Sequence, residues 1–169
     1  MMKKIFITAF AIFSGLLFSQ IAIGKTSISS PSVSLEFANT EPRGLVLPWV
    51  FSASGVTGAV NGTLIYDTSD KKVKVKYASG WKDLSVDTTG ILNTSLQDPL
   101  IENSSAKVSI GIPTSTPGIL VLEDSNKAMI LPKVPYSDIV NPSAGMMVYD
   151  TTAKQLAVFN GSVWSFWKP

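Results

Sequence analysis

The clearest alternation of apolar and polar positions lies near the C-terminal end of the chain. A β-prone apolar run over 146–149 is followed by a polar turn and then by a second apolar run over 156–159. The dipeptide Asn160-Gly161 comes next and is a strong hairpin signal, because a type I′ turn needs positive φ at both central positions. The run 163–167 then returns as a third strand. This pattern predicts a three-stranded antiparallel meander.

A second meander is predicted earlier in the chain, and the two belong to an internal repeat. The text GTLIYDT at 62–68 returns as GMMVYDT at 145–151. The same landmarks occur in the same order in both halves: Ile-Gly, Pro, Leu-Glu, Leu-Pro, Tyr-Asp-Thr and Trp. We therefore divide the chain into copy one (21–85), a linker rich in Thr, Asn, Ser and Asp (86–107), and copy two (108–169).

The fold class that follows is mainly all-β. Each copy is a short-strand repeat that ends in a meander, formed in copy one by 63–66, 73–77 and 81–84. Short strands are also expected at 33–37 and 120–123. The segments 44–50 and 128–134 each contain a Pro, which suits edge strands or strand ends.

Lysine alternates with Val, Val and Tyr over 72–77. This pattern predicts a strand with one solvated lysine face and one buried apolar face. We interpret the lysines as an aid to solubility and edge protection rather than as an anion site, because the equivalent Gln155 and Ala157 are uncharged.

The landmark order resembles a secreted repeat of Bacteroidota surface proteins, whose pattern runs IGIGT, LLLPR, NPxxG, YDTT and YNGxxW. It is also similar to modules of phage tail-fibre-like proteins. The close match is 141–164 in copy two, whereas in copy one Trp49 replaces the usual basic residue and Ser79-Gly80 replaces Asn-Gly. The resemblance implies a β-rich, often trimeric, structural or adhesive module, and it carries over no catalytic residue.

The first residues have the pattern of an export signal. A basic start with Lys3 and Lys4 precedes an apolar run over 5–18 that is short for a membrane span. We predict a signal peptide, with an N-terminal signal helix, over 1–20. The cut could fall as late as residue 24, where Ala-Ile-Gly fits the small-x-small rule, and a retained membrane anchor is the alternative.

Composition excludes several classes of function. The chain has 14 Lys+Arg and 12 Asp+Glu, so loss of two signal lysines leaves a neutral mature protein without a basic stripe for nucleic acid. It contains neither Cys nor His, which excludes Cys/His zinc sites, Cys nucleophiles and Ser–His–Asp triads. We expect no catalytic residue, no cofactor and no metal, and no membrane span once the signal is removed.

The repeated acids favour structural roles. Asp67 and Asp150 each open a turn, where an Asp side chain usually accepts hydrogen bonds from backbone N–H groups two residues on. Glu36 and Glu123 follow a Leu in a strand and are expected to face solvent. Asp67, Ser69 and Asp70 could supply oxygen ligands to calcium, but copy two lacks the equivalent of Asp70.

The tryptophans divide into repeated and unrepeated ones. Trp81 and Trp164 recur, which favours core residues that close each meander. Trp49 and Trp167 do not recur, and we predict that Trp49, or Trp167 with Phe166, contributes to an oligomer or ligand contact.

The leading hypothesis is an exported cell-surface or secreted structural or adhesive module that acts through protein–protein association, with a homotrimer implied by the resemblance. A glycan-binding module that uses exposed Trp faces is the alternative. An enzyme would need a carboxylate pair from outside the repeats, such as Glu41, Asp98 or Glu102, and no spacing supports one. The sequence neither favours nor opposes a further possibility, namely that the chain is an accessory subunit of a larger envelope machine.

Overall fold

The computed structural model describes residues 20–168 apart from 40, 96, 102 and 104. The predicted signal peptide and its helix therefore lie, except for Gln20, outside the described residues. Within the described part the chain is mainly β-structure, which confirms the predicted fold class. No helix there is long and apolar enough to cross a membrane.

The strands follow the repeat. Copy one contains β1 (Ile21–Ile23), β2 (Val33–Phe37), β3 (Leu45–Val46), β4 (Trp49–Val50), the 3₁₀ turn η2 (Ala53–Gly55), β5 (Leu64–Asp67), β6 (Lys72–Tyr77) and β7 (Gly80–Asp83). Copy two contains β8 (Val108–Ile110), β9 (Leu120–Leu122), β10 (Ala128–Ile130), the 3₁₀ turn η3 (Tyr136–Asp138), β11 (Met146–Asp150), β12 (Gln155–Phe159) and β13 (Trp164–Trp167). In this order β8 to β10 correspond to β1 to β3, and β11 to β13 correspond to β5 to β7.

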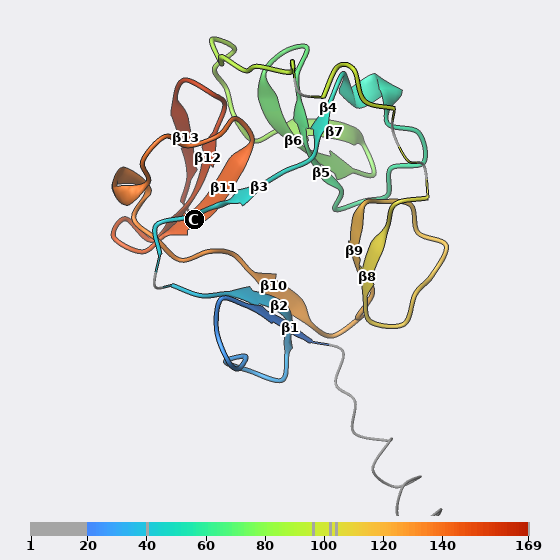
Figure 1. Cartoon of the computed structure of the whole chain (residues 1–169), viewed down its shortest axis with the longest axis vertical. Coiled ribbons are helices and arrows are strands. Elements are labelled where there is room, and N and C mark those ends of the chain that lie inside the picture. Colours follow the sequence, from blue (N-terminus) through green and yellow to red (C-terminus); the bar gives the residue numbers. More distant parts are fainter. Residues whose placement is uncertain (1–19, 40, 96, 102, 104, 169) are drawn as a thin grey trace, which may run out of the picture.

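Both predicted meanders are present as three antiparallel strands, and a fourth strand joins each, antiparallel in the case of β3 and parallel in the case of β4. One four-stranded sheet has the order β4-β5-β6-β7, and the other has the order β13-β12-β11-β3 (Figure 1). The fourth strand of each sheet comes from the Pro-interrupted segment 44–50. Pro48 lacks an N–H and separates β3 from β4, so this one segment runs from the copy-two meander to the copy-one meander.

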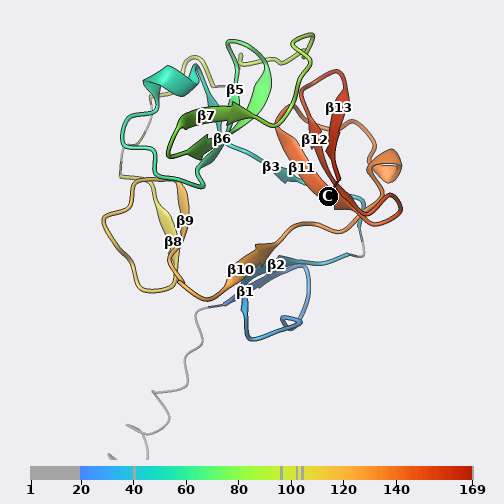
Figure 2. The ribbon, with the colours of Figure 1, turned by 180° about the vertical axis from the view of Figure 1, so that it is seen from behind.

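The other two sheets are parallel, which the apolar pattern does not predict. β1 pairs with β2, β8 pairs with β9, and β10 adds to the free side of β2 across the two copies. Seen from the front and from behind, the four small sheets follow one another around the molecule (Figures 1 and 2). The repeat is therefore interlocked, because each copy contributes a strand to a sheet of the other.

The largest core cluster also draws on both copies. Its buried members are Leu47, Tyr66, Val73, Ala144, Met147 and Val158. A smaller cluster belongs to copy two alone and contains Val134, Val148 and Ala157. Burying a side chain of this size is worth about 1.5–3 kcal/mol, so the shared cluster holds the two copies together.

The turn between β12 and β13 forms at the predicted place but is not of type I′. Gly161 has a φ of +104°, whereas the φ of Asn160 is not positive. The Asn160 Oδ1 instead accepts hydrogen bonds from the backbone N–H groups of Ser162 and Val163, at 2.9 and 2.8 Å. The side chain of Asn160 thus builds the turn, so the expected turn type was wrong.

The lysine face of β6 is not simply solvated. Val73 is fully buried, as predicted, but Tyr77 on the same face is exposed at the strand end. Lys72 pairs with Asp83 at 2.7 Å, and Lys74 pairs with Asp67 at 2.9 Å with its side chain largely buried. Lys72 and Lys74 are held in ion pairs because the adjoining strands and turn carry carboxylates.

Candidate oligomer interface

Tyr66 is the centre of the contact between the two copies. It is fully buried, and its hydroxyl donates a hydrogen bond of 2.6 Å to the backbone carbonyl of Asn160. Burial, with smaller contributions from the charges of Asp70 and Asp67, raises the pKa of Tyr66 to about 12. The phenol therefore keeps its proton and remains a donor to copy two.

Trp49 also contributes to the contact between the two copies. Its indole Nε1 donates a hydrogen bond of 2.8 Å to the carbonyl of Ala144, and its ring lies 6.0 Å from the ring of Tyr66. Gly145 has a φ of +77°, and a Cβ there would lie 2.8 Å from Tyr66. The backbone of copy two thus approaches these rings closely, and the Trp49 indole N–H has a partner within the chain.

The predicted linker packs over the tip of the β12–β13 hairpin. The Asn160 side-chain amide donates to the backbone and side-chain oxygens of Asp87, at 2.9 and 3.0 Å. A Cβ on Gly161 would lie 2.3 Å from the carbonyl oxygen of Ile91, and a Cβ on Gly90 would lie 2.0 Å from that of Asn160. Glycine is required at both positions because the two backbones touch.

Phe166 and Trp167 lie at the other end of β13 and differ from Trp49. They are 43% and 40% exposed. Phe166 packs edge-on against Tyr136 at 4.9 Å, and the Trp167 indole donates to the carbonyl of Leu84. The structure therefore separates the three predicted contact residues. Trp49 lies between the copies, whereas Phe166 and Trp167 are exposed, although the Trp167 indole also bonds to the end of copy one. Their part in an oligomer or ligand contact stays a prediction.

The two repeated tryptophans are half-buried rather than fully buried. Trp164 lies 5.7 Å from Tyr136 and 5.1 Å from Phe159 and packs against the smaller core cluster. The prediction of a core tryptophan thus holds in part for Trp164, because β13 is an edge strand with one face open.

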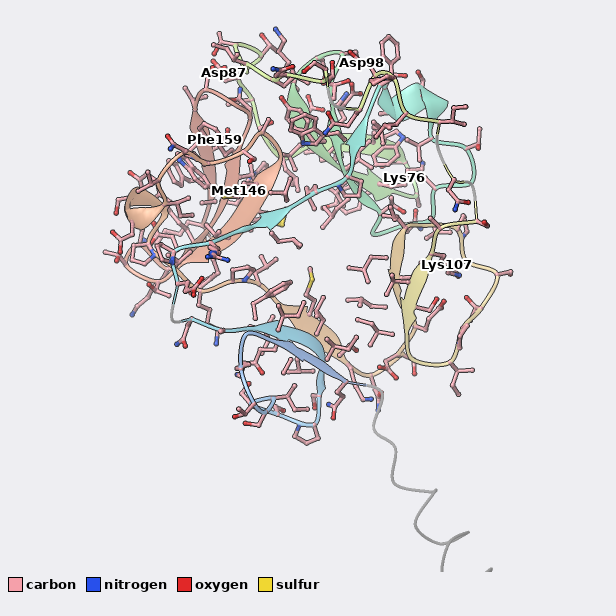
Figure 3. All side chains as sticks on the ribbon, viewed as in Figure 1. Lys76, Asp87, Asp98, Lys107, Met146 and Phe159 are labelled. Carbon is pink, nitrogen blue, oxygen red and sulfur yellow. The ribbon has the colours of Figure 1, made fainter. Side chains whose placement is uncertain are left out.

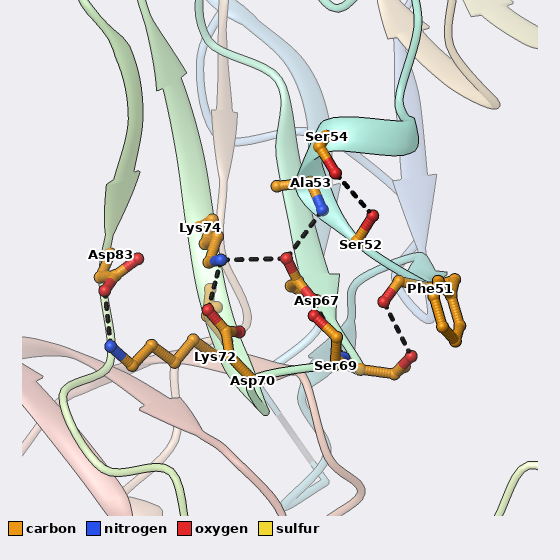
Figure 4. Close-up of polar contacts among 12 residues, drawn as sticks. Phe51, Ser52, Ala53, Ser54, Asp67, Ser69, Asp70, Lys72, Lys74 and Asp83 are labelled. Carbon is orange, nitrogen blue, oxygen red and sulfur yellow. Dashed lines mark hydrogen bonds and ion pairs between the residues drawn. The ribbon is translucent and has the colours of Figure 1, made fainter.

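The turn-opening aspartates are confirmed in their structural role. The Asp67 Oδ1 accepts a hydrogen bond from the N–H of Ser69 at 3.0 Å, and the Asp150 Oδ1 accepts one from the N–H of Thr152 at 2.8 Å. The second oxygen of Asp67 also accepts from the N–H of Ala53 at 2.7 Å (Figure 4). Both side chains are buried where their turns need an acceptor.

The possible calcium ligands already hold a cation, the ammonium group of Lys74. It bonds to Asp67 and Asp70 (Figure 4). Burial opposes ionisation of Asp67, but hydrogen bonds from Ser69, Lys74 and Ala53 outweigh it and lower its pKa to about 2. Within the described residues, no cluster of three or more acids that could hold a metal ion is present.

The expectation for the repeated glutamates was wrong. Glu36 is only 4% exposed; its carboxylate pairs with Lys25 at 2.7 Å and accepts from the N–H of Ser29 at 2.7 Å. The Glu123 carboxylate accepts from the N–H of Thr114 at 3.1 Å and lies 3.7 Å from Lys107. The hydrogen bond from Lys25 is the main cause that lowers the pKa of Glu36, and the hydrogen bond from Thr114 is the main cause that lowers the pKa of Glu123. Each Glu is covered because the loop between the paired strands folds back over it.

The acids considered for an enzyme are placed as follows. Glu41 forms a surface pair of 2.8 Å with Arg43, and Asp98 accepts a hydrogen bond of 3.0 Å from the hydroxyl of Thr94. Glu102 lies outside the described residues.

One family model matches the chain, over residues 110–168, and its description is a phage tail like trimerisation region. The match runs from the end of β8 to just beyond β13, so it covers copy two. No curated protein and no solved structure matches the chain. The similarity supports the resemblance to phage tail-fibre-like modules and a structural module that associates with protein.

Proposed function

We propose that this chain is an exported, non-catalytic structural module that assembles into a homotrimer and acts at the cell surface or in secreted form. It works by presenting its sheets and loops to a protein partner, to which it adheres.

The observation that carries the proposal is the position of the trimerisation-region match. It falls on copy two, and copy one has the same order of strands. The side chains that are unrepeated and exposed, Phe166 and Trp167, lie inside the matched range.

Exposed apolar side chains supply independent support. They gather on β8, β9 and the loop between them, and they are Val108, Ile112, Ile119 and Leu120. Apolar side chains in neighbouring positions on a surface mark sites of association with protein. A homotrimer would remove such surface from water, at about 25 cal/mol for each Å² of apolar area.

The mass of the purified mature protein in solution tests the assembly. We expect light scattering and sedimentation equilibrium to give three times the protomer mass at micromolar concentration. A mass equal to one protomer across the same range would overturn the trimer.

N-terminal sequencing of protein secreted by a Gram-negative host tests export. Gln20 donates a hydrogen bond of 2.6 Å to the carbonyl of Val33, and β1 pairs with β2. A cut at residue 24 would remove this strand, so we expect the mature protein to begin at or near residue 20. Retention of the uncut chain in the inner membrane would overturn export.

A further inference from the structure

The two parallel sheets are unequal, although the repeat gives both the same starting pair. β2 lies in the middle of its sheet, with β1 on one edge and β10 on the other. Among the described residues, β9 has a partner on one edge only, namely β8. The edge of β9 that corresponds to the β10 side of β2 is therefore open.

The backbone of β9 is oriented for another strand. The carbonyl of Ile119 accepts from Val108, and the N–H of Glu123 donates to Ile110, each at 2.8 Å. Successive residues of a strand direct their polar groups to opposite edges, so the N–H and C=O groups of Leu120 and Leu122 point away from β8. They form a template for a further parallel strand.

Burial marks the same difference. On β2, Val33 and Leu35 are 4% and 2% exposed. On β9, the residues of the corresponding face are Leu120, which is 42% exposed, and Leu122, which is half-buried. The apolar face that is fully buried in copy one is thus open at Leu120 and half-buried at Leu122 in copy two.

The repeat also identifies the strand that fits the open edge. β10, which covers β2, corresponds to β3 in copy one, with Gly44, Leu45 and Val46 matching 128–130. In the part of the chain that the structure describes, β3 is itself an edge strand paired only with β11, and Val46 is 43% exposed. Within one chain β3 is fixed away from β9, because it pairs with β11 and the N–H of Leu47 donates to Gly145 at 3.0 Å.

We propose that β3 of one chain adds as a parallel strand to β9 of a second copy of the chain, as β10 adds to β2 within each chain. The inference rests on the proposed homo-oligomer and names its contact. Because the two edges belong to different parts of the protomer, the contact is head-to-tail, and three such contacts close a ring.

The internal template also restricts the register. β10 pairs with β2 with Met129 opposite Leu35. The carbonyl of Ile23 in β1 accepts a hydrogen bond from the N–H of Ala38, and the equivalent carbonyl of Ile110 in β8 accepts one from the N–H of Glu123. The loop between the two paired strands is therefore two residues shorter in copy two than in copy one. A shift of two residues keeps each side chain on its face. Leu45 therefore lies opposite Leu120 or Leu122.

Engineered cysteines test the pairing in a chain that has none of its own. Leu45→Cys is combined with Leu120→Cys in one variant and with Leu122→Cys in a second. A third variant combines Leu45→Cys with Val140→Cys, at an exposed position in another part of copy two. Each purified variant is oxidised and run on a denaturing gel without reductant, beside a light-scattering measurement of its native mass.

We expect disulfide-linked dimers and trimers from at least one of the first two variants, with several-fold less from the third. A native trimer without such links, or with equal linking in all three variants, would overturn the β3–β9 contact and leave the homotrimer standing. Linking only within one chain would overturn it likewise. A native monomer in all variants and in the parent protein would overturn the proposed function itself.

Discussion

Tyr66 and Tyr149 occupy the same position of the repeat, but Tyr66 is fully buried and Tyr149 is 39% exposed. The local structure is the same at both sites, because each Tyr precedes a buried Asp that opens a turn. What differs is the neighbour: copy two covers Tyr66, whereas Tyr149 has no third copy against it in the described part of the chain. In the proposed trimer, the uncovered positions of copy two are the places where a further copy would lie.

The two parallel sheets show the same difference between the copies. β2 is paired on both edges, with β10 of copy two on one of them, and its Val33 and Leu35 are buried, whereas β9 lies at a sheet edge. Apolar side chains stand out toward neighbouring sheets around the middle of the molecule (Figure 3). Copy one thus receives a strand from copy two at β2, whereas β9 receives no corresponding strand in the described part of the chain. The predictions below test this inequality.

Truncating the paired tyrosines should give the largest difference between the copies. Tyr66→Ala removes a fully buried ring and its hydrogen bond to Asn160, which should lower the free energy of unfolding by about 3–5 kcal/mol. Tyr149→Ala should lower it by less than about 1 kcal/mol. Urea unfolding of both variants measures the difference, and equal losses would contradict the inequality.

The two hairpin glycines should differ by a smaller amount. Gly80 and Gly161 both have positive φ, but a Cβ on Gly80 meets nothing within 4 Å, whereas one on Gly161 meets the carbonyl of Ile91. Gly80→Ala should cost about 1 kcal/mol for the backbone strain alone. Gly161→Ala should cost about 2 kcal/mol more, because the linker must also move. Thermal unfolding of the matched pair tests this, and a similar loss in both would show that the linker does not rest on the hairpin.

Acid should destabilise copy one through Asp67. Its pKa is about 2 in the folded chain against 3.8 ordinarily, so its contribution is present above pH 4 and is lost as pH falls toward 2. The contribution is worth about 2 kcal/mol at neutral pH. Unfolding measured from pH 7 to pH 2 should show this loss.

Asp67→Asn should flatten that part of the acid profile. Glu41→Gln, at a side chain that is 60% exposed, is the control and should leave the profile unchanged. An unaltered slope in Asp67→Asn would mean that another carboxylate governs the acid transition.

The meanders could be predicted because their signals are local. Each strand alternates or runs apolar over four to six residues, and the turns contain Gly or Asp, so the bounds of β6 and β12 follow from the sequence to within one residue. The turn role of Asp67 followed likewise, from a side chain that bonds to its own turn.

The parallel pairs and the copy-to-copy contacts could not be predicted in this way. β10 meets β2 across many intervening residues, and nothing in either segment specifies the partner. The burial of Glu36 depends on a loop that folds back from β1, and the burial of Tyr66 depends on copy two. Comparison of the copies identified the equivalent residues, and only the fold revealed which of them are covered.

The unrepeated tryptophans should give the smallest effect. Trp49→Phe keeps a ring beside Tyr66 but leaves the carbonyl of Ala144 without its donor, which should cost about 1 kcal/mol of protomer stability. Trp167→Phe removes the donor to the carbonyl of Leu84, but this hydrogen bond is exposed and water can replace it, so the loss should be less than half of that. If Trp49 acts between the copies of one chain, its variant should unfold earlier in urea while the native mass stays that of the parent. If Trp167 contacts a second chain, its variant should show the opposite pattern, with a lower native mass at dilution and an almost unchanged protomer. A lower native mass of Trp49→Phe, with its urea unfolding unchanged, would contradict these assignments. The oligomer contact would then lie at the junction of the copies rather than on the open surface of β13.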